Sequence, residues 1–577
     1  MPSMRLLLYP LWATAVLAAP YNTYDHHDPS PTVKIKNGTV EGVHSSQYNQ
    51  DYFLGIPYAQ SPTGNLRFRV PQPLNTTWRA PFSAKQYSPA CIGYGSDQWP
   101  LAISEDCLYL NVVRPSGYEG EQLPVAFWLH GGGLYQGSGI DPRYNLSAFV
   151  QRSVDIGKPI IGVSINYRLS MWGFINGDEV VESGNANNGL KDQRLALHWV
   201  QENIHAFGGD PAKVTLWGES AGALSVGLHL TAYGGRDDKL FRSAIMQSGG
   251  PIHYRTLAWD PTILLNASNS FGCSNTESDL SSTPILDCLR KVDTWTLSSW
   301  INSTVPKWTW NPIIDNDFIQ GKTSLQIESG AFVHVPIISG ANSDEGTAFG
   351  PRPMNSSEHL QIYLTNTSSP VKLTPSQATR ILDTYPANIT YGAVPTNRPL
   401  SWIPPPKYGP AVRRSDAYFG DLFFVAHRRK ICQTWTANSL PVYCYRFNTV
   451  PHGISLDIGA THFQEVAFVF NNQAGLGYGY KNVSENPFEG MPEGYFQLAE
   501  TMSAAWIEFI SEGVPVLPDG RGEWPAYGEG EGGLEGGIGS NWVFDANVTG
   551  LGHAERDDFR KDGIELINSW NADVYLR

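Results

Sequence analysis

The sequence predicts an α/β fold in which a large, mostly parallel central sheet carries helices on both faces. Short, continuously apolar runs indicate buried strands at residues 124–130, 159–166, 214–218, 335–340 and 442–447. Runs of this kind are typical of strands that are covered on both faces. Between the second and third runs, residues 189–207 place apolar side chains at helical spacing. Helices that alternate with buried strands favour a parallel sheet.

The segments that break this alternation are predicted to be long insertions. Residues 255–310 and 350–430 show no clean alternation of strand and helix patterns. Residues 527–540 are rich in glycine and precede a last short strand at 542–544. We therefore expect residues 19–577 to form a single domain, with a loose segment at 19–32 and two insertions that leave the sheet. The length is sufficient for a large buried core.

The composition excludes several classes of protein. Hydrophobic residues make up 41% and aromatic residues 12% of the 577 residues, which is too apolar for a disordered chain. Only 16% of the residues are charged, and 40 Lys and Arg against 54 Asp and Glu give a net charge of −14. This acidic balance argues against nucleic acid as a partner.

The first 18 residues have the pattern of a secretory signal peptide. Arg5 precedes an apolar stretch at 6–15, and small residues lead to an expected cleavage after Ala18. A membrane anchor is the weaker alternative, because the stretch is shorter than the ~20 residues that span a bilayer. We expect a secreted, extracellular protein that carries N-glycans. N-x-S/T sequons occur at Asn37, Asn75, Asn145, Asn266, Asn302, Asn355, Asn366, Asn388, Asn482 and Asn547.

The six cysteines fall in three neighbouring pairs, and an oxidising compartment favours their pairing as disulfides. The pairs are Cys91 with Cys107, Cys273 with Cys288, and Cys432 with Cys444. For the third pair, buried free thiols are the alternative. No CxxC motif or clustered Cys and His spacing suggests a metal, so we expect no metal and no other cofactor.

The motif with the clearest chemistry is Gly-Glu-Ser-Ala-Gly, with the serine at position 220. It follows the strand pattern at 214–218 and precedes an apolar helical run at 223–230. In a strand–turn–helix setting, G-x-S-x-G is a nucleophile elbow, which exposes the serine hydroxyl above the sheet. The helix N-terminus behind the serine stabilises negative charge on a substrate. Ser220 is therefore predicted to be a catalytic nucleophile.

A second motif, His-Gly-Gly-Gly at 130–133, directly follows the predicted strand 124–130. Consecutive glycines let the backbone approach a ligand closely, so that N–H groups can bind an oxyanion. A structural turn is the alternative when this run is taken alone, and the serine motif downstream favours the oxyanion hole. Its predicted donors are the N–H groups of Gly132, Gly133 and Ala221.

A serine nucleophile needs a base, and the base needs an acid to orient it. In α/β-hydrolases the chain order is serine, acid, histidine, which directs the search for the acid to residues 343–347 after the predicted strand 335–340. The candidate bases are the later histidines, His359, His427, His452, His462 and His553. His427 adjoins two arginines, so a solvated helix face is predicted for it, and the spacing alone does not separate His452 from His462.

The predicted base also predicts a pH dependence. Because a histidine acts as a base when it is neutral, activity is expected to rise with pH through a pKa of ~6.5.

The order of motifs between roughly residues 33 and 548 resembles the type-B carboxylesterase/lipase family, which includes cholinesterases and several fungal lipases. The similar segments include FLGIPYA from 53, EDCLYLNV from 105, the HGGG run, GLKDQRLAL from 189, FGGDP from 207, the serine motif, MQSG from 246 and DEGT from 344. The resemblance implies an α/β-hydrolase fold and a carboxylic ester hydrolase (EC 3.1.1.-) that acts on small-molecule esters.

The resemblance also implies roles for particular residues. The acid is Glu345, because it occupies the Glu of the D-E-G-[TS] motif, and the base is His462, because it fits a G-x-x-H segment. It further implies the disulfides Cys91–Cys107 and Cys273–Cys288 and an ion pair between Arg67 and Glu105. It says less about Cys432 and Cys444.

Two departures from the family bear on the substrate. Only 15 residues separate Cys91 from Cys107, whereas in the lipases of the family this loop is longer and forms a lid. Trp99 lies in the loop but not at the position of the choline-binding Trp of cholinesterases, and Leu134-Tyr135 replaces the usual Phe after HGGG. We expect an open esterase pocket, with a true lipase for long-chain acylglycerols or sterol esters as the alternative. A non-catalytic, cholinesterase-like binding module is the alternative from another class.

Overall fold

The structure is a computed structural model of the chain. It describes residues 30–577 except 253–254, 259, 274–283, 307–308, 367–368, 370, 480–484, 519 and 531–532. The predicted signal peptide, residues 1–18, and the sequon at Asn482 lie outside the described residues. Of the helices in the described part of the chain, none is long and apolar enough to cross a membrane.

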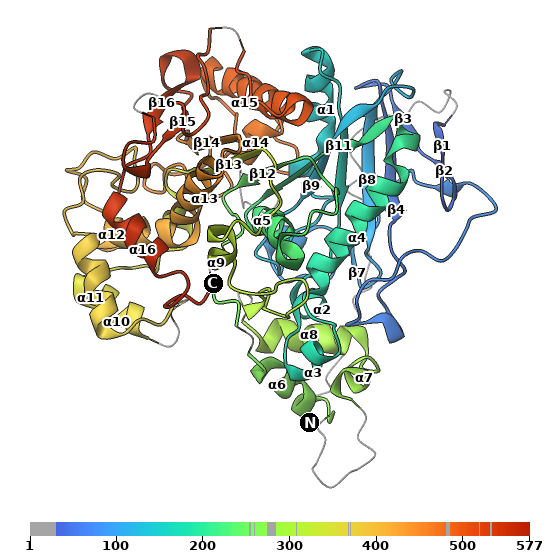
Figure 1. The fold of residues 1–577 in the computed structure, drawn as a ribbon, viewed down its shortest axis with the longest axis horizontal. Coiled ribbons are helices and arrows are strands. Elements are labelled where there is room, and N and C mark those ends of the chain that lie inside the picture. Colours follow the sequence, from blue (N-terminus) through green and yellow to red (C-terminus); the bar gives the residue numbers. More distant parts are fainter. Residues whose placement is uncertain are drawn as a thin grey trace, which may run out of the picture.

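A large mixed sheet forms the centre of the molecule (Figure 1). Within the described residues it has 11 strands in the order β16-β15-β14-β13-β12-β11-β9-β10-β8-β4-β3. The strands from β10 and β9 through β11 to β15 are mutually parallel. Antiparallel strands extend both edges, β8, β4 and β3 on one side and β16 on the other. The predicted mostly parallel sheet is therefore confirmed, and its antiparallel edges are additions to it.

The strand bounds follow the predicted apolar runs closely. The strands predicted from apolar runs are present as β9, β10, β11, β13 and β14, and the last short predicted strand is β15. The sequence did not predict β3, β4, β8, β12 or β16. The bounds are β3 Val43–Ser45, β4 Gln50–Pro57, β8 Tyr109–Pro115, β9 Leu123–Leu129, β10 Ile161–Ile165, β11 Gly209–Glu219, β12 Ser243–Gln247, β13 Ile337–Asn342, β14 Val442–Phe447, β15 Ser540–Phe544 and β16 Gly552–Arg556, with the minor strands β1 Thr32–Ile35, β2 Gly38–Glu41, β5 Phe82–Ser83, β6 Ala90–Cys91 and β7 Ile103–Ser104.

Alternate side chains of the central strand β9 enter two different hydrophobic clusters, because successive residues of a strand point to opposite faces. Phe127 and Leu129 pack in the cluster that includes α4 (Asn188–Asn203) and α5 (Ala221–Gly235). Trp128 packs in the cluster that includes α1 (Leu146–Asp155), α14 (Val466–Val469) and α15 (Glu493–Glu512). Helices therefore cover both faces of the sheet, as predicted.

The two predicted insertions are helical. The first, with α6 (Thr262–Ser270), α7 (Ile285–Leu289) and α8 (Thr294–Thr304), lies beside α2 (Ser170–Phe174) and α3 (Asp178–Glu182) at the bottom of Figure 1. The second contains α10 (Ser357–Thr365), α11 (Pro375–Thr384) and α12 (Val412–Gly420), and shares a third hydrophobic cluster with α16 (Lys561–Ser569). Other elements are α9 (Thr323–Glu328), a π-helical turn at Asp421–Val425, and α13 (Ala426–Ala437).

One sequence prediction about α13 is wrong. His427 and its two arginine neighbours were expected on a solvated face, but the three side chains are 1–2% exposed. Arg428 and Arg429 both pair with Asp557, at 2.6 Å and 2.9 Å. A buried acid that follows β16 therefore compensates the two charges, and this partner is too distant in sequence for the local pattern to reveal.

Candidate active site

Ser220 occupies the turn between β11, which ends at Glu219, and α5, which begins at Ala221. Its backbone has φ 55° and ψ −121°, a conformation that few non-glycine residues adopt and that often marks a functional site. The N–H of Ser220 donates to the carbonyl of Gln247 on the neighbouring strand β12, at 2.8 Å. A Cβ at Gly222 would lie 2.1 Å from the Leu129 carbonyl oxygen, so only glycine lets α5 approach β9 this closely.

A histidine and a carboxylate complete a line of hydrogen bonds with the serine. His462 Nε2 lies 2.8 Å from Ser220 Oγ, and His462 Nδ1 lies 2.6 Å from Glu345 Oε2. Glu345 follows β13 in a short 3₁₀ turn, Glu345–Ala348, and His462 lies in the loop between β14 and α14. The other Glu345 oxygen accepts from Asn342 N–H at 2.8 Å and from the Ser248 hydroxyl at 2.5 Å, which fixes the carboxylate.

Several acids surround this histidine. Glu219 Oε1 lies 3.3 Å from His462 Nε2. Burial by itself lowers the pKa of His462, but Glu345 and Glu219 outweigh it and raise that pKa to about 9. Burial also raises the pKa of Glu219 well above its ordinary value and raises that of Glu465. The site therefore stabilises a protonated imidazolium more strongly than the sequence alone suggested.

The glycine loop predicted to hold an oxyanion lies beside Ser220. Gly132 and Gly133 have φ values of 95° and 62°, so the loop turns back directly after β9. The loop is held from outside, because Ser170 N–H donates to the Leu134 carbonyl at 2.7 Å. His130 is buried, which lowers its pKa to about 4, and stacks on Tyr167 at 4.3 Å. A neutral His130 keeps positive charge off the loop.

A cavity of about 1080 Å³ opens over Ser220 and His462. Near the histidine its wall is aromatic: the Phe424 ring stacks on His462 with centroids 4.6 Å apart, and Phe349 meets it edge-on at 5.0 Å. The rest of the lining mixes polar and apolar side chains, and much of it comes from the two insertions. Its polar members are Asp97, Asn176, Arg255, Thr256, Asp260, Thr309, Asn311, Tyr363 and Ser369, and its apolar members include Ile252, Ala258, Ile263, Pro306 and Ile313.

Of the histidines considered from the sequence, His462 contacts Ser220 and the others lie elsewhere. His452 pairs with Glu485 at 2.7 Å near the surface, His359 and His553 are exposed, and His427 is buried in α13. The sequence did not single out Glu219, Ser248 or Glu465. Glu219 stands inside the serine motif, so its proximity to the histidine was implicit in that motif. Ser248 lies in the MQSG segment directly after β12, and Glu465 is the acidic residue that follows the G-x-x-H segment, so both stand in segments that resemble the family although no role was predicted for them.

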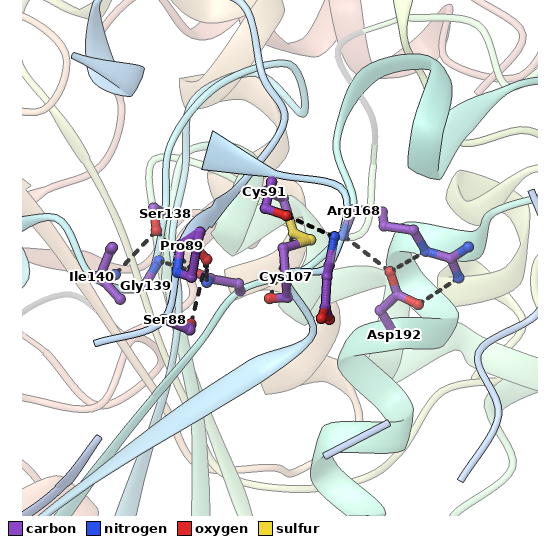
Figure 2. Close-up of a disulfide and its surroundings, with 12 residues drawn as sticks. Ser88, Pro89, Cys91, Cys107, Ser138, Gly139, Ile140, Arg168 and Asp192 are labelled. Atoms are coloured by element: carbon purple, nitrogen blue, oxygen red, sulfur yellow. Dashed lines mark hydrogen bonds and ion pairs between the residues drawn. A yellow bond between two sulfur atoms is a disulfide. The ribbon is translucent and has the colours of Figure 1, made fainter. Parts of the chain in front are cut away.

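The three cysteine pairs are disulfides in the structure, and the described chain has no free cysteine. Figure 2 shows Cys91–Cys107 between the Arg168–Asp192 ion pair and the segment that carries Ser138. The disulfide closes the short loop that brings Asp97 to the cavity. At the base of this loop, Arg67 and Glu105 form the expected ion pair, at 2.6 Å.

Among the residues that the structure describes, no group of three or more His, Cys, Asp or Glu side chains is arranged to hold a metal ion. A serine at a strand–helix turn, a histidine and a carboxylate on a large parallel sheet define the class of the protein. It is a serine hydrolase of the α/β-hydrolase fold.

Comparison with known proteins identifies the family. The model of the carboxylesterase family matches residues 29–535. Lipase 2 of Geotrichum candidum is 33% identical over 545 residues, covering 85% of this chain and 91% of its own length. Secreted lipase 1 of Botryotinia fuckeliana is 32% identical over 514 residues, covering 81% and 87%. The crystal structure of Aspergillus niger EstA superposes with a TM-score of 0.78 at 28% identity, covering 96% of this chain and 100% of that one.

The chain belongs to the carboxylesterase family. It is a carboxylic ester hydrolase, and its substrates are small-molecule esters.

Proposed function

We propose that the protein hydrolyses carboxylic esters through an acyl-enzyme on Ser220, with His462 as base and Glu345 as its orienting acid. The observation that carries the proposal is the line of contacts from Ser220 Oγ to His462 Nε2, 2.8 Å, and from His462 Nδ1 to Glu345, 2.6 Å. In this geometry His462 accepts the serine proton while Glu345 fixes the ring and stabilises the imidazolium.

The reaction proceeds in two halves. Ser220 Oγ attacks the ester carbonyl, its proton passes to His462 Nε2, and the oxyanion forms against the N–H groups of Gly132, Gly133 and Ala221. The imidazolium then protonates the leaving alcohol as the C–O bond breaks, which leaves an ester on Ser220. Water gives a proton to His462 as it attacks the carbonyl carbon of this ester. The bond from that carbon to Ser220 Oγ then breaks, the imidazolium returns its proton to Oγ, and the carboxylic acid leaves.

Replacement of Ser220 by Ala tests the nucleophile. We expect kcat for p-nitrophenyl acetate to fall by ~10⁴-fold or more, because no other hydroxyl lies at this position of the elbow. Ser299→Ala, on the exposed surface of α8, serves as the control and should retain full activity. Wild-type-like turnover by Ser220→Ala would contradict the assignment.

Covalent labelling separates an enzyme from a binding module that retains only the fold. A fluorophosphonate should label the wild-type protein at Ser220, and mass spectrometry of the digested protein locates the adduct. Failure of the wild-type protein to react would favour the non-catalytic alternative.

We propose an esterase that prefers soluble esters. The short loop between Cys91 and Cys107 supports this preference, because the resemblance associates a longer loop with the lid of the family's lipases. The names of the fungal relatives favour a lipase instead. A panel of p-nitrophenyl esters from acetate to palmitate distinguishes the two: an esterase loses activity with chain length, whereas a lipase gains it when the substrate passes its solubility limit.

We propose that the protein acts outside the cell. Three disulfides and the signal-peptide pattern support this location, as does the name of the Botryotinia fuckeliana relative, Secreted lipase 1. N-glycans at exposed sequons belong to the same proposal. Among the sequons that the structure describes, Asn37 is the least suited to carry a glycan, since it is 8% exposed and its side-chain amide donates to the Thr76 carbonyl at 2.7 Å.

A further inference from the structure

The aspartate directly before Glu345 has no role in the chemistry described above, yet it is completely buried. Asp344 is 0% exposed, and burial raises its pKa to about 6. Among the described residues, none forms an ion pair with it within 4.0 Å. A buried carboxyl group costs free energy unless its oxygens accept hydrogen bonds, so its acceptor contacts identify what it does.

Those contacts join two segments that are far apart in the sequence. One oxygen of Asp344 accepts from Ala460 N–H at 2.8 Å, and the other accepts from Thr396 N–H at 2.7 Å. The backbone N–H of Asp344 donates in return to the Ala460 carbonyl at 3.0 Å. Asp344 therefore holds the loop at residues 459–462, which we call the histidine loop because His462 ends it, and also the second insertion at Thr396.

The neighbours of Asp344 hold the same loop. Asn342 donates its side-chain amide to the Thr461 carbonyl at 2.7 Å, and the Thr347 hydroxyl donates to the Thr461 hydroxyl at 2.7 Å. With the Glu345–His462 contact, the segment 342–347 binds three successive residues of the histidine loop. The carboxylate and the imidazole are thus positioned by one rigid junction.

The close approach of the histidine loop to Asp344 also explains why position 459, three residues before His462, is a glycine. Gly459 has φ +73°, and a Cβ there would lie 2.1 Å from Asp344 Oδ2. Any larger residue would push the loop away from the carboxylate. An asparagine at 344 would also fail, because two N–H donors face its two side-chain atoms and an amide offers only one acceptor.

We propose that Asp344 is a positioning residue that holds His462 in register with Glu345 and Ser220. The proposal rests on the proposed function, since it assigns Asp344 no contact with the substrate. Loss of the Ala460 or Thr396 bond lets the histidine loop shift, and a misplacement of about 1 Å costs on the order of 10²-fold in rate.

The test is Asp344→Asn, assayed for kcat, KM and the pH dependence of kcat/KM with p-nitrophenyl acetate. We expect kcat to fall by about tenfold or more with KM nearly unchanged. The acidic limb of the pH profile should move to lower pH, because a displaced His462 loses part of its stabilisation by Glu345. Unchanged kcat and an unchanged pH profile would overturn the proposal.

Asp557→Asn is the matched control, because it also removes a buried carboxylate but one that contacts Arg428 and Arg429 and not the histidine loop. It should lower the melting temperature without moving the pH profile. If both variants lower activity only in proportion to their loss of folded protein, Asp344 is merely structural and the proposal fails.

The rate of Ser220 labelling by a fluorophosphonate distinguishes this failure from failure of the proposed function. Wild-type protein that does not react contradicts the role of Ser220 itself. Wild-type protein that reacts, together with an Asp344→Asn variant that reacts at the same rate, contradicts only the role of Asp344. Slower labelling of a folded Asp344→Asn variant supports it.

Discussion

At the scale of single residues, the site is defined by the number of carboxylates around one imidazole. Glu345 and Glu219 both lie within 3.3 Å of His462, whereas a serine hydrolase mechanism requires only one acid. An ionised carboxylate stabilises the protonated imidazole, and the imidazolium in turn opposes the effect of burial on the pKa of Glu219, so the histidine gives up its proton at a higher pH than an isolated side chain does. The midpoint near ~6.5 expected from the sequence should therefore be too low.

The pH dependence of kcat/KM tests this effect. His462 acts as a base only when neutral, and its pKa is raised to about 9, so activity should rise with pH and be greater at pH 8 than at pH 6. Glu219→Gln removes one acid and should move the acidic limb to lower pH by about one pH unit. Glu202→Gln is the control, because Glu202 lies on the exposed surface beside Lys36. This variant should leave the acidic limb of the pH profile unchanged. Coincident profiles for wild type and Glu219→Gln would contradict this account.

At the scale of secondary structure, the contact between β9 and α5 determines the position of Ser220. The serine motif and the glycine loop come from neighbouring parallel strands, β11 and β9, so their turns meet at the carboxyl edge of the sheet. Their separation depends on how closely α5 approaches β9. This explains why the motif requires a small residue on the helical side of the serine.

Gly222→Ala tests that closeness. Because the new Cβ would lie 2.1 Å from the Leu129 carbonyl, α5 must move, and a shift of about 1 Å is expected to cost on the order of 10²-fold in kcat. The melting temperature should fall as well. Gly120→Ala is the control, since nothing lies within 4 Å of a Cβ there. Full activity of Gly222→Ala would show that the helix position is not critical.

At the scale of the whole molecule, residues 576–577 support a wall of the cavity that the first insertion forms. The first insertion supplies Thr256 and Ala258 to the lining, and Leu257 between them is 0% exposed. The N–H of Leu257 donates to the Leu576 carbonyl at 3.1 Å. Arg577 is 0% exposed, and its carbonyl accepts from the Ser324 hydroxyl. The last residues of this sequence therefore fix a wall of the pocket.

Removal of residues 576 and 577 should loosen this wall. A lost hydrogen bond is worth about 1 kcal/mol, so we expect KM to rise by about fivefold while kcat changes little, because Ser220 and His462 are not in this wall. Leu576→Ala, which keeps the backbone carbonyl, is the matched control and should retain the wild-type KM. Equal KM values for the truncated and wild-type proteins would contradict this role.

The sequence by itself predicted the central strands of the sheet, the serine that we propose as nucleophile and the glycine loop that we propose binds the oxyanion. Those features depend on local chemistry: apolar runs form buried strands, and glycines two residues before and after Ser220 permit a tight turn. The resemblance to the carboxylesterases, rather than spacing, separated His462 from His452.

Only the tertiary structure decided which charges are buried and which side chains meet. Arg428 and Arg429 are buried because Asp557 lies beside them, and Asp344 acquires its partners from segments about 50 and 115 residues further along the chain. Such contacts leave no local pattern, because hydrogen bonds and ion pairs depend on distance in space. Glu345 was expected beside His462, but the distances from His462 to Glu345 and Glu219, and the raised pKa of His462 that results, come only from the tertiary structure.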